Sequence, residues 1–191
     1  MAHVASWREQ LRRGLIEASR GSPVAAPPTD VDAFNAAELS RSAGVSLADA
    51  AGRADTLLAD LIDLWATVGD RPFSWYIAKT TSEALVRNSY AHPRNHIAEH
   101  FIERGDRARG YQIYEESAME LRQAAAPPPT LGAALYNLAC ARVGQGQREE
   151  ALRLLEEALP MRADIRVTAA ADPDLAPLRS DPRFQRLLKP L

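Results

Sequence analysis

Cysteine, lysine and long apolar runs are scarce in this sequence of 191 residues. Cys140 is the single cysteine, which excludes an internal disulfide and favours a reducing compartment. No apolar run reaches the roughly 18 residues of a membrane span. The first residues carry a histidine and charges where a signal peptide needs an apolar core. We therefore expect a cytoplasmic protein that does not enter a membrane.

The charged residues nearly balance. In total, 23 basic and 25 acidic side chains leave a formal net charge of −2, which favours neither nucleic acid nor an anionic membrane as a partner. Lys79 and Lys189 are the only lysines, so arginine supplies almost all of the positive charge, a bias typical of GC-rich bacterial genomes. With 46% hydrophobic residues, the composition is that of an ordinary globular protein.

Strand signals are also absent, and the pattern of apolar residues predicts helices instead. Apolar side chains recur at intervals of three and four residues, so we expect an all-α fold. Asp30 is placed to cap one helix, and Gly69 ends another. Helices are expected over residues 4–19, 31–39, 46–68, 74–92, 94–104 and 111–121, in a hairpin over 130–160, and in two short closing segments after Asp172-Pro173 and Asp181-Pro182.

Two stretches repeat a helix, a glycine turn and a second helix. The first turns at Gly105 and the second at Gly144–Gly146. Such a hairpin cannot bury its apolar face alone, so the pattern indicates stacked hairpins. The second hairpin resembles a tetratricopeptide repeat, and the residues at that family's packing positions are Leu135, Leu138, Ala139, Gly146, Ala151, Leu155 and Ala158.

The first hairpin resembles the same repeat more loosely, through Ile97, Ala98, Phe101, Gly105 and Tyr114. Arg142 stands where the repeat prefers an aromatic residue, and Gly110 stands where it has alanine. The resemblance implies a concave groove that binds a protein or peptide partner. The residues that would line this groove are Tyr136, Asn137, Cys140 and Val143. The alternative is that the hairpins only extend and close the fold.

Three motifs of the first half resemble the DinB-like helical bundles, in particular the ClbS/DfsB branch. They are His3–Trp7, Val31–Ala37 and Asn88–His96, and the likeness covers about residues 1–104. The resemblance implies a four-helix bundle, which we expect to be shortened at its N-terminus because that family has a helix before its first histidine. Metal-binding members hold a divalent ion with three histidines, and the matching positions are His3, His92 and His96.

The spacing of these histidines suits an ion. Residues four apart lie on one face of a helix, so His92 and His96 can share a metal while His3 comes from a facing helix. Neutral imidazoles with open coordination positions suit zinc, nickel, iron or manganese, and such an ion polarises a bound water or thiol. The alternative is that all three are ordinary polar residues at a helix seam or on the surface.

One helix is expected to serve both halves of the chain. If each residue advances by 100° from residue 85 to residue 105, His92 and His96 lie on one side and Ile97 and Phe101 on nearly the opposite side. This predicts a bundle part over residues 1–104 and a hairpin part over 93–191. The helix over about 93–104 is then shared, with no flexible linker.

A bundle shortened at its N-terminus predicts that another part of the chain or a second subunit contacts the first helix. Without a preceding helix, the apolar flank that carries Trp7, Leu11 and Leu15 would be left for the chain's own tail or for a second subunit to cover, as in a homodimer through the N-terminal helix.

Two functions remain as hypotheses. The first is a helical protein-interaction or assembly module, with the bundle as its scaffold. The second is a metal-dependent hydrolase, or a thiol-linked transferase or isomerase, whose catalytic residues the sequence does not identify. Cys140 lies in an alanine-rich run and is interpreted as a small packing residue rather than a nucleophile. The sequence contains no glycine-rich phosphate loop, serine-nucleophile motif or cysteine–histidine zinc cluster.

Overall fold

The computed structural model describes residues 1–189 and contains two units, Met1–Pro93 and Arg94–Leu191. Helices dominate both units, which confirms the predicted all-α class, and the strands within residues 1–189 form one small hairpin. No helix in this described part is both long and apolar enough to cross a membrane. The boundary between the units lies inside the helix that we expected the two parts to share.

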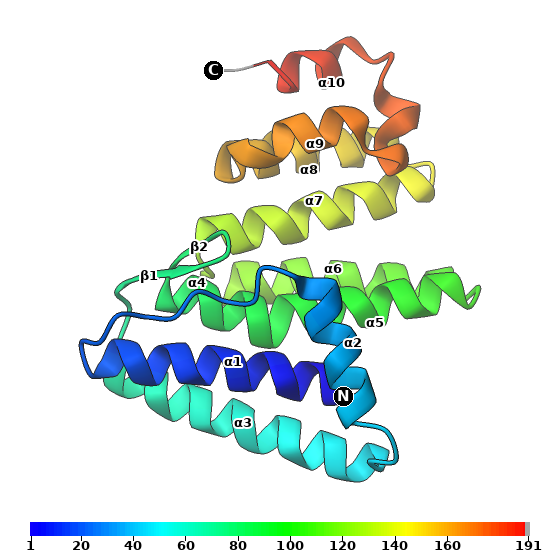
Figure 1. Ribbon diagram of the computed structural model, residues 1–191. Helices are drawn as coiled ribbons and strands as arrows, with labels where there is room; N and C mark the ends of the chain where they lie inside the picture. Colours follow the sequence, from blue (N-terminus) through cyan, green and yellow to red (C-terminus); the bar gives the residue numbers. More distant parts are fainter. Residues whose placement is uncertain (190–191) are drawn as a thin grey trace. The chain divides into compact units, whose positions relative to one another are not determined.

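The first unit is built on two long helices, α1 (Ala2–Ser19) and α3 (Leu47–Val68), which lie side by side (Figure 1). Apolar residues four apart form the inner face of α1, where Leu11 and Leu15 are fully buried. The shorter helix α2 (Val31–Arg41) begins at its predicted cap, because the Asp30 carboxylate accepts a hydrogen bond from the Ala33 amide at 2.9 Å.

Residues 72–80 form a strand hairpin, so the helix that we expected from residue 74 is wrong at its start. Strand β1 (Pro72–Trp75) pairs antiparallel with β2 (Ala78–Thr80). Phe73 and Trp75 are buried and alternate with exposed neighbours, which is the two-residue period of a strand. Gly14 of α1 makes room for them, since a Cβ there would lie 3.2 Å from both rings. Helix α4 (Thr81–Val86) follows the hairpin, capped by Thr80.

The apolar flank of α1 is covered within the first unit. Trp7 is only 8% exposed, and its ring lies 4.7 Å from that of Phe34 of α2, centre to centre. Leu11 and Leu15 share a core cluster with the hairpin's Phe73. The expectation that a tail or a second subunit must cover this flank is therefore wrong, because α2 and the β-hairpin already do so.

A π-helical turn, η1 (Arg87–Ala91), joins α4 to α5 (His92–Glu103) without a break. Pro93 accounts for the turn, because proline has no amide hydrogen and its ring crowds the carbonyl four residues earlier, that of Ser89. The Ser89 carbonyl instead accepts a hydrogen bond from the Arg8 guanidinium at 3.0 Å. The uniform advance of 100° per residue that we expected through this segment is therefore wrong before His92.

Helix α5 buries a narrower face than expected. Ala98 is fully buried, Phe101 is half-buried, and Ile97 is 47% exposed. The expectation that Ile97 lies on the side of the helix that packs with the hairpin part is therefore wrong. The contact with α6 (Arg107–Gln123) explains why, since a Cβ on Gly110 would lie 2.7 Å from the Ala98 carbonyl and 2.5 Å from Cγ1 of Ile102. The two helices approach at Ala98, which leaves Ile97 outside the contact.

The second unit contains two helical hairpins, α5 with α6 and α7 (Pro128–Gly144) with α8 (Arg148–Met161). Their predicted turns are confirmed: Gly105 and Gly146 have φ values of 90° and 77°, a left-handed conformation that favours glycine after a helix. Helix α7 packs against both α6 and α8. Leu135 and Leu138 of α7 are buried, as are Leu152 and Leu155 of α8.

Arg142 joins three helices of this unit. It lies buried on α7, and its guanidinium contacts Glu150 of α8 at 3.1 Å and Glu115 of α6 at 3.0 Å. Burial lowers the pKa of Arg142, but hydrogen bonds to the two glutamates outweigh burial and raise it overall. An ion-pair network thus surrounds this position of α7.

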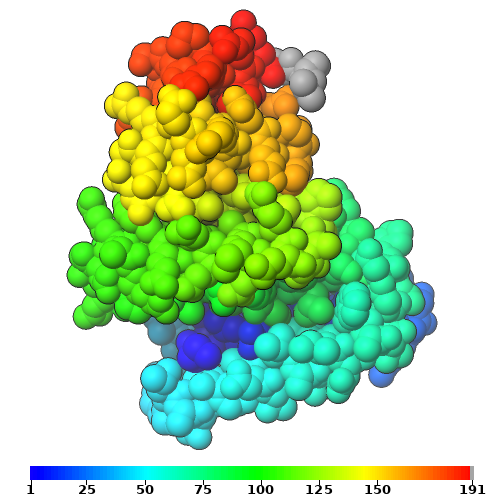
Figure 2. All heavy atoms as spheres, turned by 180° about the vertical axis from the view of Figure 1, so that it is seen from behind, coloured from blue at the N-terminus to red at the C-terminus, as the bar shows by residue number. Residues whose placement is uncertain are grey.

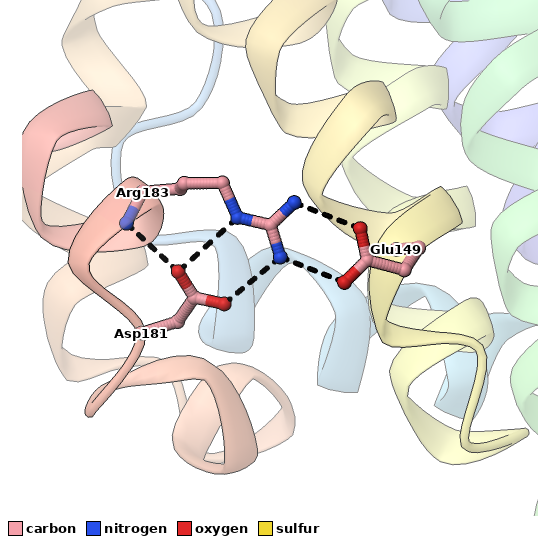
Figure 3. A network of polar contacts seen from close by, with 3 residues as sticks. All are labelled: Glu149, Asp181 and Arg183. Atoms are coloured by element: carbon pink, nitrogen blue, oxygen red, sulfur yellow. Dashed lines mark hydrogen bonds and ion pairs between the residues drawn. The ribbon is translucent and has the colours of Figure 1, made fainter.

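The closing segments are η2 (Ala163–Ile165), α9 (Arg166–Ala171), η3 (Pro173–Leu178) and α10 (Pro182–Leu187). Asp172 and Asp181 each cap a segment that begins with proline, as predicted, although η3 is a 3₁₀ rather than an α-helix. Figure 2 shows these segments, in orange to red, against the end of the α7–α8 hairpin. Arg183 of α10 pairs with Glu149 of α8 at 2.7 Å and with Asp181 at 3.1 Å (Figure 3).

Candidate functional site

A hollow of about 550 Å³ opens on the second unit, between α5, α6, α7 and η3. All of the residues predicted to line a partner groove do line this hollow, namely Tyr136, Asn137, Cys140 and Val143. They share one face of α7 because they are spaced by one, three and three residues. The volume lies within the range of about 300–1,000 Å³ that is typical of ligand sites. A partner in this hollow stays a prediction.

Tyrosines form much of the wall. Tyr111 and Tyr114 come from α6, and Tyr136 comes from α7. The hydroxyl of Tyr136 donates a hydrogen bond to Asp172 at 2.6 Å. Burial raises the pKa of Tyr136 well above its usual value, and the hydrogen bond and charge of Asp172 add to this. Burial and the charge of a nearby glutamate act in the same direction on the pKa of Tyr114. Both phenols therefore stay neutral at physiological pH.

Gly144 gives Tyr111 its place at the rim of the hollow. A Cβ on Gly144 would lie 2.6 Å from the Tyr111 hydroxyl, so the bare backbone of α7 leaves the space that this phenol occupies. The close approach brings a third aromatic ring to the wall.

Carboxylates supply all of the formal charge of the lining. Asp172 and Asp174 come from the start of η3, and Glu99 and Glu103 come from α5. Among the described residues that line the hollow there is no arginine or lysine. Asp172 is already engaged, because one oxygen accepts from Tyr136 and the other accepts from the Asp174 amide at 2.9 Å. The hollow is therefore electronegative, with Glu103 and Asp174 near its edge exposed to solvent.

Cys140 is a poor nucleophile in this setting. Burial raises the pKa of its thiol, and the negative charges of Asp172 and Asp174 raise it further. Its sulfur and one oxygen of each aspartate all lie within 4.8 Å of one another. The thiol is thus neutral at physiological pH, in keeping with the interpretation of Cys140 as a packing residue.

The sequence alone does not reveal the acidic part of this site. Asp172 was identified only as a helix cap, since the Asp-Pro pair is a local signal for a helix start. Its second role, as acceptor for Tyr136, depends on a contact between residues 36 apart in the chain. No spacing rule within one helix reveals that contact.

Two of the predicted metal ligands meet in the first unit. His3 lies near the start of α1 and His92 begins α5, and their ring centres are 6.1 Å apart. One ligand nitrogen of His3 lies within 4.8 Å of one of His92. His96 follows one turn along α5, beyond the boundary between the units. His96 is exposed and also contacts Glu99, Nδ1 to Oε2, at 3.3 Å.

Contacts between α1 and the π-turn position His92. The Arg8 guanidinium donates to the Ser89 carbonyl, and the Asn88 amide donates to the Trp7 carbonyl at 3.2 Å. These contacts hold the turn immediately before His92 against α1, the helix that carries His3. The sequence alone assigns no role to Arg8 or Asn88, because a π-turn has no simple sequence signal apart from Pro93.

Comparisons with protein-family models, with curated proteins and with solved structures find no match for this chain. The function is therefore inferred from the residues and their geometry. The hollow of the second unit offers neutral phenols, an amide and carboxylates to a partner. The histidines on α1 and α5 offer imidazole nitrogens to a metal ion.

Proposed function

We propose that this chain is a helical interaction module whose second unit binds a segment of a protein partner in the hollow beside α7. The observation that carries the proposal is that four α7 residues chosen from the sequence line one open hollow. The two helix pairs with left-handed glycine turns at Gly105 and Gly146 further support the assignment of this unit to tetratricopeptide-like repeats. Such hairpins bind segments in a concave face.

The chemistry of the wall suits a peptide. Tyrosine is enriched at protein interfaces because it combines a large apolar ring with a hydroxyl that forms hydrogen bonds. Tyr111, Tyr114 and Tyr136 provide such rings, and the half-buried Asn137 amide can both donate to and accept from a peptide backbone. The hollow thus offers apolar contact and hydrogen bonds in the same place, as a peptide segment requires.

A peptide display library tests the proposal with two tryptophan variants. Asn137→Trp fills the hollow with a large side chain. Val167→Trp is the matched control, because Val167 of α9 is 83% exposed and does not line the hollow. The library is selected on the unaltered protein, and each enriched peptide is then measured against both variants.

We expect enriched peptides to bind the unaltered protein and Val167→Trp alike, and to bind Asn137→Trp at least tenfold more weakly. Circular dichroism establishes that both variants are folded. Peptides that bind all three proteins equally would place the partner elsewhere on the chain. A library that yields no saturable binder would also count against the proposal.

A divalent-metal site at the histidines is the second candidate, favoured by the approach of His3 to His92 from helices far apart in the sequence. Under this proposal the first unit belongs with the DinB-like bundles, and His96 supplies a third imidazole. The donor set fits zinc, nickel, iron or manganese, since neutral imidazole is their common protein ligand. When bound, such an ion would polarise a coordinated water or thiol.

Calorimetric titration with Zn²⁺ tests this second candidate. We expect one equivalent to bind the unaltered protein and His100→Ala, because His100 is an exposed residue of α5 outside the set. His92→Ala is expected to abolish binding, and His3→Ala is expected to weaken it by tenfold or more. Binding that survives in His92→Ala, or no saturable binding in the unaltered protein, would refute the metal assignment.

A further inference from the structure

We infer that the hollow recognises an arginine side chain of the partner segment; this inference rests on the proposed function and adds the chemistry of the ligand. The lining carries acidic residues and, among its described residues, no basic one. A positively charged side chain is the occupant whose charge complements such a surface. The tyrosines of the wall further decide between the two cationic side chains, arginine and lysine.

The carboxylates of the lining come from two elements of the unit. Glu99 and Glu103 lie one turn apart on α5, while Asp172 and Asp174 lie at the start of η3. Asp174 and Glu103 make no side-chain hydrogen bond or ion pair within residues 1–189, so their oxygens are available to an incoming donor. A cation in the hollow would therefore meet acceptors from two elements of the unit.

The tyrosines favour a guanidinium over an ammonium group. Arginine has a planar, weakly hydrated head that stacks on aromatic rings and donates several hydrogen bonds in a fixed plane, whereas the lysine head is a strongly hydrated point charge. Tyr114 and Tyr136 stay neutral because burial and nearby carboxylates oppose their ionisation. The half-buried Tyr114 thus brings an aromatic ring to the hollow without a competing charge, while Tyr136 holds Asp172 in place through its hydroxyl.

The amide of Asn137 and the rim ring of Tyr111 would contact the chain on either side of the arginine. The volume of about 550 Å³ exceeds the space of one side chain, so neighbouring residues of the segment can also enter. The thiol of Cys140 and two aspartates also form a group that could hold a metal ion. The experiment includes that occupant as an opposing outcome.

Two tripeptides provide the probe: acetyl-Ala-Arg-Ala-amide and its citrulline counterpart, which has nearly the same shape but no charge. Each is titrated into the full-length ¹⁵N-labelled protein, and the backbone amide shifts of Asn137, Cys140 and Val143 are followed. The titrations are repeated with Asp174→Asn and Glu103→Gln. The matched control is Glu156→Gln, because Glu156 is an exposed residue of α8 that does not line the hollow.

We expect saturable shifts with the arginine peptide and at least tenfold weaker binding of the citrulline peptide, because the neutral urea group of citrulline forms no ion pair with the carboxylates. Asp174→Asn and Glu103→Gln are each expected to weaken arginine binding about two- to fivefold, the range of partly exposed ion pairs. Glu156→Gln is expected to leave binding unchanged. EDTA is expected to have no effect.

Three outcomes would overturn the inference. Equal binding of the two tripeptides would remove the role of charge but leave the proposed function intact. No saturable shift with the arginine peptide would exclude this ligand, while the library selection decides the proposed function separately. Stoichiometric Zn²⁺ binding that shifts Cys140 and blocks the arginine peptide would assign the hollow to a metal ion instead.

Discussion

Replacing Arg8 with methionine should destabilise the first unit by about 2–3 kcal/mol. This value is the free energy lost with two charged hydrogen bonds, less the desolvation cost of the buried guanidinium that is regained. Arg8 is 6% exposed, and its guanidinium donates to the Ala54 carbonyl at 2.7 Å and to the Ser89 carbonyl at 3.0 Å. Methionine keeps an apolar chain of similar length but has no donor. Both carbonyls would then lose this donor.

The magnitude follows from two opposing effects. Each hydrogen bond from a charged donor contributes about 1.5–3 kcal/mol, so the loss of two costs about 3–6 kcal/mol. Against this, removing a buried guanidinium recovers part of its desolvation cost. That cost is evident from the pKa of Arg8, which burial lowers although the charge of Asp55 partly opposes the shift. The difference leaves a net loss of about 2–3 kcal/mol.

A substitution of Pro93 tests the hydrogen bond from Arg8 to the Ser89 carbonyl separately from the one to Ala54. In Pro93→Ala, residue 93 gains an amide hydrogen that can reach the Ser89 carbonyl four residues earlier. Arg8→Met should therefore cost about 1 kcal/mol less in the Pro93→Ala background than in the unaltered protein. This double-mutant cycle tests whether the arginine substitutes for the hydrogen bond that proline cannot make.

Urea denaturation followed by tryptophan fluorescence is the assay. The three tryptophans, Trp7, Trp65 and Trp75, all lie in the first unit, so the signal reports on that unit alone. An Arg8→Met variant within about 0.5 kcal/mol of the unaltered protein would refute the reasoning, because surface changes have effects of that size. A cycle with no coupling would refute the link to Pro93.

Three further predictions concern the second unit and one matched position in the first. Gly110→Ala should destabilise the protein by about 2 kcal/mol in thermal unfolding, because the added Cβ would overlap α5. Gly52→Ala on α3 should be neutral or stabilising, because its Cβ would point into open space. Equal effects would contradict the close approach. Arg183 lowers the pKa of Glu149 through hydrogen bonding and charge. A carboxylate whose pKa is lower in the folded than in the unfolded protein stabilises the fold at pH values above its unfolded pKa of about 4. This stabilisation is lost as the pH falls through the folded pKa. In Arg183→Met, the free energy of unfolding in urea should therefore fall less steeply as the pH is lowered than in the unaltered protein. Parallel curves of this free energy against pH for the two proteins would disprove the prediction. Cys140 should react with iodoacetamide far more slowly than glutathione at pH 8, because burial raises the pKa of its thiol; equal rates by mass spectrometry would contradict it.

Much of the helical framework could be predicted because its signals are local. The Asp30 cap lies within three residues of the amide that it binds, and the glycine turn at Gly146 depends only on backbone conformation. The face of α7 that lines the hollow follows from the periodicity of one helix. Each of these features is decided by neighbours in the sequence.

The features that could not be predicted depend on distant contacts. The strand at Phe73 forms because Gly14 of α1 leaves room for an aromatic ring, and nothing near residue 73 indicates this. Ile97 is exposed because α6 approaches α5 at Ala98 and Ile102, opposite Gly110. A helical wheel of α5 does not show which of its apolar residues the neighbouring helix contacts. The acidic side of the candidate site comes from η3, whose Asp172 has a local role and a distant one.

The central claim is that the hollow of the second unit binds a partner segment, and isothermal titration of the strongest library peptide tests it most directly. The prediction is one-to-one binding to the unaltered protein and to Val167→Trp with equal dissociation constants. Binding to Asn137→Trp should be at least tenfold weaker, a loss of about 1.4 kcal/mol or more. Equal affinity for all three proteins would contradict the account.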